Sequence, residues 1–362
     1  MSARILHVLE SARPSPGSVA ISLGGLFAEV QRRGWQAAFA AEDPDETGFL
    51  AQHAITFTCD QARGLALADF DVVHVHGWGY DLARAAASAA RKLRKPYLIS
   101  PGGAATDAEN GLWRRLYWRF VDGPLFRRAK WIGAVNPFEQ ASLAEAGWNE
   151  NVRVLPYGAD FAALSKGSGA EPAAPIPDQS RKLVVMGEVD SRSGCVALLK
   201  ALAEVGPDAD GWQVVLCGSC GDQWKKALQA AVTRKGAEDR VLWVQADGLE
   251  QQRKLLAGAG LFVSPSPRVR PPVAVVQAIA AGVPVLATQC SAPPELDSQI
   301  DVCEAGRSDL REALRRILRT PALRRRERAQ EARARAATVL DWPHLADRYL
   351  EVYESVASSS AR

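Results

Sequence analysis

The stretch that decides the fold is LFVSPSPRVRPPVAVVQAIAAGVPV, residues 261–285. Residues 261–263 have the continuous apolar character of a buried strand, and a proline-rich turn follows them. Residues 273–281 are almost entirely apolar, which predicts a buried helix that ends at Gly282. A second apolar strand begins at residue 285. Strand, loop, helix and strand form one right-handed βαβ unit, and parallel sheets built from such units bind ligands at the carboxyl ends of their strands.

The composition of the whole chain is that of a globular protein with two domains. It has 362 residues, 47% of them hydrophobic, and a net charge of +3, which is too balanced to favour nucleic acid as a partner. No apolar run reaches the roughly 18 residues of a membrane-spanning helix. Residues 4–9 predict a first strand rather than a signal peptide, and six cysteines without such a signal predict reduced thiols. We therefore expect a cytoplasmic protein.

Further βα units flank the opening stretch. The strand at residues 4–9 leads through a loop with Gly17 and Ser18 into a helix predicted at residues 19–33. A helix start next to a small-residue loop can bind an anion, although ordinary turn chemistry explains the same residues. Residues 165–180 are rich in Gly, Pro, Ser and Ala, which predicts a linker between two domains.

Several motifs together resemble the group 1, or family four, class of retaining glycosyltransferases, which have the GT-B fold. Pro265-Ser266 and the small residues between 278 and 285 match the framework of the donor-binding signature of that class. The resemblance continues through three further stretches, namely DVVHVHG at 71–77, VRVLPYGAD at 152–160 and WPHLADRYLEVY at 342–353.

The resemblance implies an α/β protein of GT-B architecture, with two Rossmann-like parallel-sheet domains facing across a cleft. Residues 1–164 would form the acceptor-side domain, 165–180 the linker and 181–338 the donor-side domain. A helix at 339–357 would cross back onto the N-domain. The implied activity is transfer of a sugar, with retention, from a nucleotide-diphosphate sugar to a glycan or lipid-linked acceptor. Such transfer serves surface polysaccharide or glycolipid assembly and needs no cofactor beyond the donor substrate.

The residues that carry the chemistry of this family are replaced in this chain. Val269 and Gln277 stand at its two glutamates, and Gly102 stands at the histidine that lies near the reacting sugar. Pro272 replaces the glycine at the helix start and offers no N–H group, and Glu188 replaces an arginine that grips the donor diphosphate. Transfer needs the charge of the donor diphosphate to be neutralised by preorganised groups. Because these groups are replaced, we expect weak or no binding of nucleotide sugars.

Other residues remain as candidates for donor binding. Three arginines in the loops of the donor-side domain could hold phosphate in a rearranged site, and glycines end two of its strands. The candidates are Gly17, Ser18, Gly187, Arg192, Gly218, Arg268, Arg270 and Gln277.

On the acceptor side, His74 and His76 alternate along one strand and so face the same side of the sheet. His76 is either a satisfied histidine near the sheet end or a catalytic candidate that lines the acceptor cleft. Cys217 and Cys220 have the spacing of a metal or redox pair, but no second pair follows at ligand spacing. We therefore predict no metal site.

Residues 112–131 interleave aromatic side chains with six cations and a single acid, Asp122. They predict either a core stripe with a solvated arginine face or a peripheral contact with anionic lipid on the inner face of the membrane. Two hypotheses for the whole protein follow. It is a transferase with an altered donor site, or it is a pseudo-glycosyltransferase that supports a partner glycosyltransferase.

Overall fold

We describe the fold from a computed structural model that defines residues 4–45, 48–52, 54–57, 66–104, 117–148, 151–165, 181–190, 193–233 and 240–358. The chain divides into two compact units. Unit 1 comprises Met1–Pro14, Val19–Gly158 and Trp342–Arg362, and unit 2 comprises Ser15–Ser18 and Ala159–Asp341. Residues 166–180 of the predicted linker lie outside the described residues.

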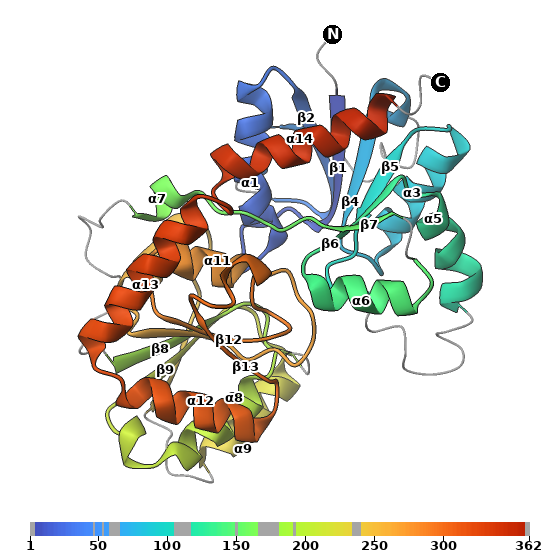
Figure 1. Cartoon of the computed structure of the whole chain (residues 1–362). Helices are drawn as coiled ribbons and strands as arrows, with labels where there is room; N and C mark the ends of the chain where they lie inside the picture. The colour runs from blue at the N-terminus through green and yellow to red at the C-terminus, as the bar shows by residue number, and fades with distance from the viewer. Residues whose placement is uncertain are drawn as a thin grey trace. The chain divides into compact units, whose positions relative to one another are not determined.

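Unit 1 is built on a seven-stranded parallel sheet in the order β3-β2-β1-β4-β5-β6-β7 (Figure 1). Its central strands are buried on both faces because helices cover both sides. The strands are β1 (Arg4–Ser11), β2 (Gln36–Asp43), β3 (Ile55–Phe57), β4 (Val72–His76), β5 (Tyr97–Ser100), β6 (Trp131–Ala134) and β7 (Val152–Val154).

The helices of unit 1 follow the strands as a βα pattern predicts. They are α1 (Val19–Arg32), α3 (Asp81–Lys92), α5 (Gly123–Arg128), α6 (Pro137–Glu145) and α14 (Trp342–Ser358), with a π-helical turn at Trp118–Asp122 and 3-10 turns at Leu50–Gln52 and Ala66–Asp69.

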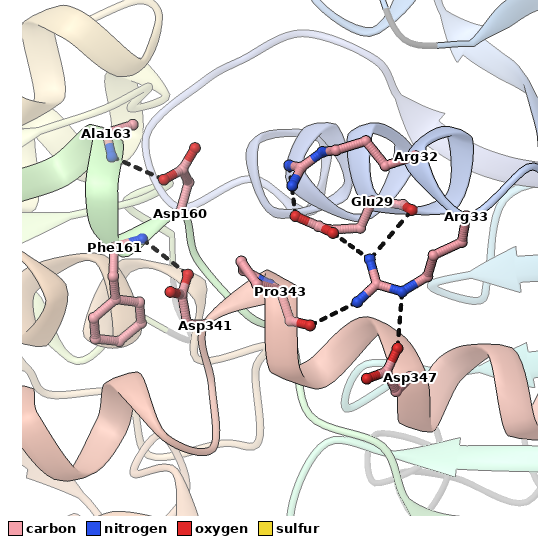
Figure 2. Close-up of polar contacts among 9 residues, drawn as sticks. All are labelled: Glu29, Arg32, Arg33, Asp160, Phe161, Ala163, Asp341, Pro343 and Asp347. Atoms are coloured by element: carbon pink, nitrogen blue, oxygen red, sulfur yellow. Dashed lines mark hydrogen bonds and ion pairs between the residues drawn. The ribbon is translucent and has the colours of Figure 1, made fainter.

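The last helix, α14, belongs to unit 1 although unit 2 precedes it in the chain. A Cβ atom on Gly25 of α1 would overlap the ring of Trp342, so a glycine is needed where α14 begins. Arg33 donates to the carbonyl oxygen of Pro343 over 2.7 Å and to Oδ1 of Asp347 over 2.8 Å (Figure 2). The prediction that the final helix returns to the N-domain is confirmed.

Unit 2 is built on a six-stranded parallel sheet in the order β10-β9-β8-β11-β12-β13 (Figure 1). The βαβ unit predicted from residues 261–285 lies at its centre as β11, α11 and β12. The strands are β8 (Lys182–Met186), β9 (Gln213–Cys217), β10 (Val241–Val244), β11 (Leu261–Ser264), β12 (Val285–Thr288) and β13 (Asp301–Cys303).

The helices of unit 2 are α7 (Phe161–Ser165), α8 (Cys195–Val205), α9 (Asp222–Thr233), α10 (Leu249–Ala257), α11 (Val273–Ala280), α12 (Arg307–Arg319) and α13 (Ala322–Ala337), with 3-10 turns at Pro207–Ala209 and Pro294–Leu296. α11 is buried around nearly its whole circumference, which explains its uniformly apolar sequence.

The chain enters and leaves unit 2 at neighbouring points. The Ala159 N–H donates to the carbonyl oxygen of Leu340 over 3.1 Å. The Phe161 N–H donates to Oδ1 of Asp341 over 3.2 Å, and Asp160 accepts from the N–H of Ala163 at the start of α7 (Figure 2). These contacts pair the first and last segments of unit 2 and fix where the unit begins and ends.

Candidate functional site

Three of the predicted glycines meet at the carboxyl ends of the strands of unit 2. A Cβ atom on Gly17 would lie 3.6 Å from Cα of Gly187 and 3.3 Å from Cβ of Ala274 in α11. A Cβ atom on Gly218 would overlap the carbonyl oxygen of Gly187. All three glycines have positive φ, between +71° and +140°. The turns after β8 and β9 therefore pack backbone against backbone, which only glycine allows at this distance.

Arg270, one of the cations predicted to hold phosphate, has an acidic partner within unit 2. One of its terminal nitrogens lies 2.5 Å from Oδ1 of Asp190, and the two side chains are 27% and 17% exposed. Arg268 is exposed, Ser18 lies in a turn closed by its N–H and the carbonyl of Ser15, and Arg192 lies outside the described residues. The carboxylate of Asp190 thus pairs with one of the guanidinium groups that the sequence predicted to hold phosphate.

The loop between β11 and α11 is closed by apolar and local contacts. Val269 is buried, with 8% of its surface exposed, and its side chain has no hydrogen-bonding group. Pro272 is the N-cap residue of α11 and supplies neither an N–H group nor a side-chain acceptor. Oγ of Ser266 donates to the carbonyl oxygen of Arg268 over 2.8 Å, which folds the loop onto itself.

Gln277 faces the interior of unit 2. It is 1% exposed, and its Nε2 donates to Oε1 of Gln252 in α10 over 3.2 Å. Gln252 in turn donates to the carbonyl oxygen of Ala246 over 3.1 Å. Oε1 of Gln277 has no hydrogen-bond partner among the described residues. The side chain is a buried amide that links α10 and α11.

In unit 1, three histidines gather beneath the carboxyl ends of β1 and β4. His7 pairs in register with His74, and His76 follows two residues later on the same face. Nδ1 of His7 lies 2.9 Å from Nε2 of His76. The prediction that His74 and His76 face the same side of the sheet is confirmed by their ring centroids, which are 3.9 Å apart.

Tyrosine and serine hydroxyls complete this histidine cluster. Tyr353 of α14 and Ser100 of β5 lie 2.8 Å and 2.9 Å from the two ring nitrogens of His74, and the Tyr157 hydroxyl lies 3.1 Å from Nδ1 of His76. Burial lowers the pKa of His74 to about 3 and lowers the pKa values of His7 and His76 well below the usual value. The histidines are therefore neutral members of an interior hydrogen-bond network.

His7, His74 and His76 are also the described residues whose ligand atoms lie close enough together for a metal ion, within 4.8 Å of one another. Every ring nitrogen of the cluster except Nε2 of His7 already has a hydrogen-bond partner. The cluster as it stands works as a hydrogen-bond network. His76 is 3% exposed, so its predicted contact with an acceptor would require it to leave these partners.

Gly102 and Gly103 turn the chain after β5, and a buried carboxylate holds them. Oε1 of Glu139 accepts from the N–H of Gly103 over 2.5 Å, and Oε2 accepts from the N–H of Val135 over 2.8 Å. Burial raises the pKa of Glu139 to about 7 even though these hydrogen bonds lower it. Glu139 therefore shapes the loop in which the family has its histidine.

The sequence analysis did not single out His7 or Glu139. His7 could have been found from its place in the first strand, because β1 and β4 are neighbours in sheets of this type and the register then puts His7 beside His74. Glu139 stands three residues after Asn136, which is the spacing of a reciprocal helix cap.

Two protein-family models together match most of this chain. Residues 17–158 match the family model described as a glycosyl transferase 4-like domain, and residues 170–335 match the model described as glycosyl transferases group 1. This chain belongs to the group 1 glycosyltransferases. The two matches cover both units, and the expectation of a GT-B fold is confirmed.

One curated relative of this group 1 member is alpha-maltose-1-phosphate synthase of Mycolicibacterium smegmatis. The two are 28% identical over 214 residues, which cover 52% of this chain and 54% of the relative. The chain thus spans about half the length of the curated relative it matches.

Solved structures share the fold of this group 1 chain over nearly its whole length. HepE of Anabaena, solved in complex with UDP and glucose, has a TM-score of 0.77 and 18% identity, covering 98% of this chain and 100% of that chain. Sucrose-phosphate synthase of Thermosynechococcus elongatus has a TM-score of 0.79 and 17% identity, with the same coverage of both chains. At these identities the likeness shows the common fold.

Proposed function

We propose that this protein is a pseudo-glycosyltransferase that keeps the GT-B fold and supports a partner glycosyltransferase in surface polysaccharide or glycolipid assembly. The observation that carries the proposal is the ion pair between Asp190 and Arg270. In a working donor site the arginines near the diphosphate would have to neutralise its charge. Here Arg270 is neutralised from within the chain.

The other replaced positions support the same proposal. Glu188 is exposed in the same loop as Asp190, so a diphosphate with about two negative charges would meet two carboxylates. At an effective dielectric constant near 20, each close like-charge pair costs on the order of a few kcal/mol. The buried apolar side chain of Val269 cannot bind sugar hydroxyls, and Gln277 contacts Gln252 instead of a ribose.

A second candidate function is transfer with retention from a nucleotide sugar held in a rearranged donor site. The meeting of Gly17, Gly187 and Gly218 favours it, because glycines let the backbone turns come close together at the carboxyl ends of β8 and β9, where parallel sheets bind ligands. In that case Arg192, Arg268 and Arg270 would hold the diphosphate after the ion pair with Asp190 opens.

Calorimetry with UDP-glucose and GDP-mannose on the full chain separates the two candidates. The pseudo-glycosyltransferase hypothesis predicts that neither donor saturates the protein at micromolar concentrations, because the dissociation constant would be about 1 mM or weaker. A micromolar dissociation constant for either donor would refute the pseudo-glycosyltransferase hypothesis and support the second candidate.

A variant with the family residues restored tests whether the replaced residues cause the weak binding of the donor. Val269→Glu, Pro272→Gly and Gln277→Glu together return two carboxylates and one N–H group to the donor loop, and we expect at least tenfold tighter binding of UDP-glucose. Val269→Gln alone is the matched control, since it adds polarity without charge. If the folded triple variant binds no better than the original chain, the replaced residues do not explain the loss.

The place of action that we propose is an anionic lipid surface, contacted by an aromatic–basic face of unit 1. In the π-helical turn, Phe120 is 68% exposed, Tyr117 is 44% exposed and Val121 is 42% exposed. The exposed cations Arg119, Arg127, Arg128 and Lys130 follow in the same segment. The acid of this segment, Asp122, is buried and accepts from Nε of Arg84 over 3.1 Å.

Apolar side chains that protrude among cations match the interface of an anionic bilayer. The residues 112–116 of the predicted stretch lie outside the described residues, and Leu125 and Phe126 are core residues. Among the described helices none is long and apolar enough to cross a bilayer, so the proposed contact is peripheral.

Sedimentation with vesicles containing phosphatidylglycerol tests this contact. Phe120→Ser should weaken binding severalfold, and Phe138→Ser, which changes a 46% exposed phenylalanine of α6, should not. Binding that is equal on neutral vesicles, or equal losses in both variants, would contradict a lipid contact at residues 117–130.

A further inference from the structure

A cavity of about 470 Å³ opens in unit 2 beside the first two turns of α8. It lies among four segments at the carboxyl side of the sheet, namely the start of α8, α9, the segment before α12 and the loop after β11. It shares no residue with the three glycine turns described above. Its volume lies within the range of about 300–1,000 Å³ that is usual for small-molecule sites.

The charged side chains that line the cavity are mostly cationic. Lys200 comes from the second turn of α8 and Arg307 is the first residue of α12. Arg307 is loosely paired with Glu204, 3.7 Å apart, and its side chain is 57% exposed. The carboxylate in the lining, Asp190, is already neutralised by Arg270. The cavity therefore favours an anion.

The start of α8 adds to this preference. Its N-cap residue, Gly194, has a φ of 73° and no side chain. Oγ of Ser193 accepts from the N–H of Cys195 over 3.4 Å, and the next two N–H groups belong to Val196 and Ala197. Val196 and Ala197, whose N–H groups belong to that first turn, both line the cavity. Unsatisfied N–H groups and the helix dipole stabilise negative charge at such a position.

The remaining wall is apolar and partly flat. Trp224 of α9 is half-buried and lines the cavity together with Pro265 and Pro267 of the loop after β11. A tryptophan ring packs well against the C–H face of a sugar, while the hydroxyl groups of the sugar stay in contact with water.

We propose that this cavity binds a sugar phosphate. The phosphate lies at the start of α8 between Lys200 and Arg307, and the sugar ring lies against Trp224. The site goes beyond the proposed function. It shares Asp190 with the ion pair that carries that function, but none of the donor-site positions Val269, Gln277 and Arg270 lines the cavity.

Calorimetry on the full chain at low ionic strength tests the proposal with glucose 1-phosphate as the probe. We expect saturable binding that weakens as salt rises, about tenfold weaker binding of inorganic phosphate, and no binding of glucose. Equal affinities for inorganic phosphate and glucose 1-phosphate would overturn the role of Trp224. Tighter binding of UMP than of glucose 1-phosphate would overturn the class of ligand.

Single substitutions assign the binding to the cavity. Lys200→Ala and Arg307→Ala should each weaken glucose 1-phosphate binding about tenfold, and Trp224→Leu should weaken it while leaving inorganic phosphate unchanged. The matched controls are Lys226→Ala on α9 and Arg315→Ala on α12, which remove cations outside the lining. Equal losses in the controls, or no binding by the folded original chain, would overturn the site.

The same titrations keep this proposal separate from the proposed function. UDP-glucose that bound with micromolar affinity to both the original chain and Lys200→Ala would refute the pseudo-glycosyltransferase hypothesis and leave the sugar-phosphate site standing. Glucose 1-phosphate that failed to bind, with UDP-glucose also failing, would refute this site alone.

Discussion

Two helices, one in each unit, begin in different ways. In unit 1, Asn136 caps α6 by accepting from the N–H of Glu139, and the carboxylate of Glu139 accepts from the N–H groups of Val135 and Gly103. In unit 2, the N-cap residue of α8 is Gly194, which has no side chain, and a long bond of 3.4 Å from the N–H of Cys195 to Oγ of Ser193 is the side-chain contact at this helix start, which borders a cavity. The start of α6 is satisfied by a side-chain cap and a buried carboxylate, whereas at the start of α8 the N–H groups of Val196 and Ala197 border the cavity and are open to water or a ligand.

The two units place their polar groups differently. Unit 1 buries histidines, tyrosines and Glu139 beneath the ends of its strands, where they hold loops and α14 in place. Unit 2 has close-packed glycines and one ion pair at the corresponding edge, with cations around a cavity. Changes in unit 1 should therefore affect stability and its pH dependence, and changes in unit 2 should affect ligands as well.

The largest effect that we expect is a loss of stability in acid, which originates in unit 1. Burial lowers the pKa values of His7, His74 and His76, so the folded chain binds fewer protons than the unfolded chain below about pH 6.5. The contribution of the three histidines to the free energy of unfolding is complete above that pH. It is lost as the pH falls toward the folded values, by about 1 kcal/mol or more per pH unit for each histidine.

The carboxyl group of Glu139 has the opposite effect on the pH dependence of stability. Its folded pKa of about 7 lies above the usual 4.5, so its contribution is complete below about pH 4.5 and is lost as the pH rises through about 7. Three histidines outweigh one carboxyl, and denaturant unfolding should show stability falling between pH 6.5 and 4.5. Glu139→Gln should make that fall steeper, and an unchanged slope would show that the carboxyl does not titrate in this range.

The next largest effect should come from the start of α8. A Cβ atom on Gly194 would overlap the carbonyl oxygen of Pro265, and the residue has positive φ. Gly194→Ala should lower the free energy of unfolding by at least about 3 kcal/mol. Gly147→Ala is the control, because Gly147 also has positive φ but nothing lies within 4 Å of its Cβ position. It should cost about 1 kcal/mol, and equal melting temperatures of the two variants would argue against the contact with Pro265.

At the start of α6 the expected cost is smaller. Glu139→Ala leaves the buried N–H groups of Gly103 and Val135 without their acceptor, which should cost about 2 kcal/mol. Glu145→Ala, at the exposed end of the same helix, should have almost no effect. Amide hydrogen exchange at Gly103 should accelerate in the first variant only, and unchanged protection there would mean that other contacts hold the loop.

The fold could be predicted from the sequence because its strongest signals are local. Residues 261–285 carry apolar strands, a buried helix and Gly282, and each of these features depends on neighbours in the chain. The glycines at 187 and 218 could also be placed, since they end predicted strands. Their mutual packing follows from the order of β8 and β9 in the sheet.

The partners of the candidate site residues could not be predicted, because they come from distant parts of the chain. Asp190 meets Arg270 across 80 residues, and Gln277 meets Gln252 on another helix. Sequence spacing shows which groups are present but not which of them neutralise one another. The same holds for His74, whose partner Tyr353 lies in the last helix.

The smallest stability effect, and the sharpest test of the edge of unit 2, comes from Asp190→Asn. The ion pair is partly exposed, so its loss should lower the free energy of unfolding by less than about 1 kcal/mol. The freed guanidinium of Arg270 should raise the affinity for pyrophosphate severalfold, because one carboxylate is removed and one cation becomes available. In the double variant Asp190→Asn with Arg270→Gln the part of the gain that needs the cation should disappear. If both variants bind pyrophosphate equally well, the carboxylate repels anions but Arg270 does not bind them, and the second candidate function loses one of its three proposed cations.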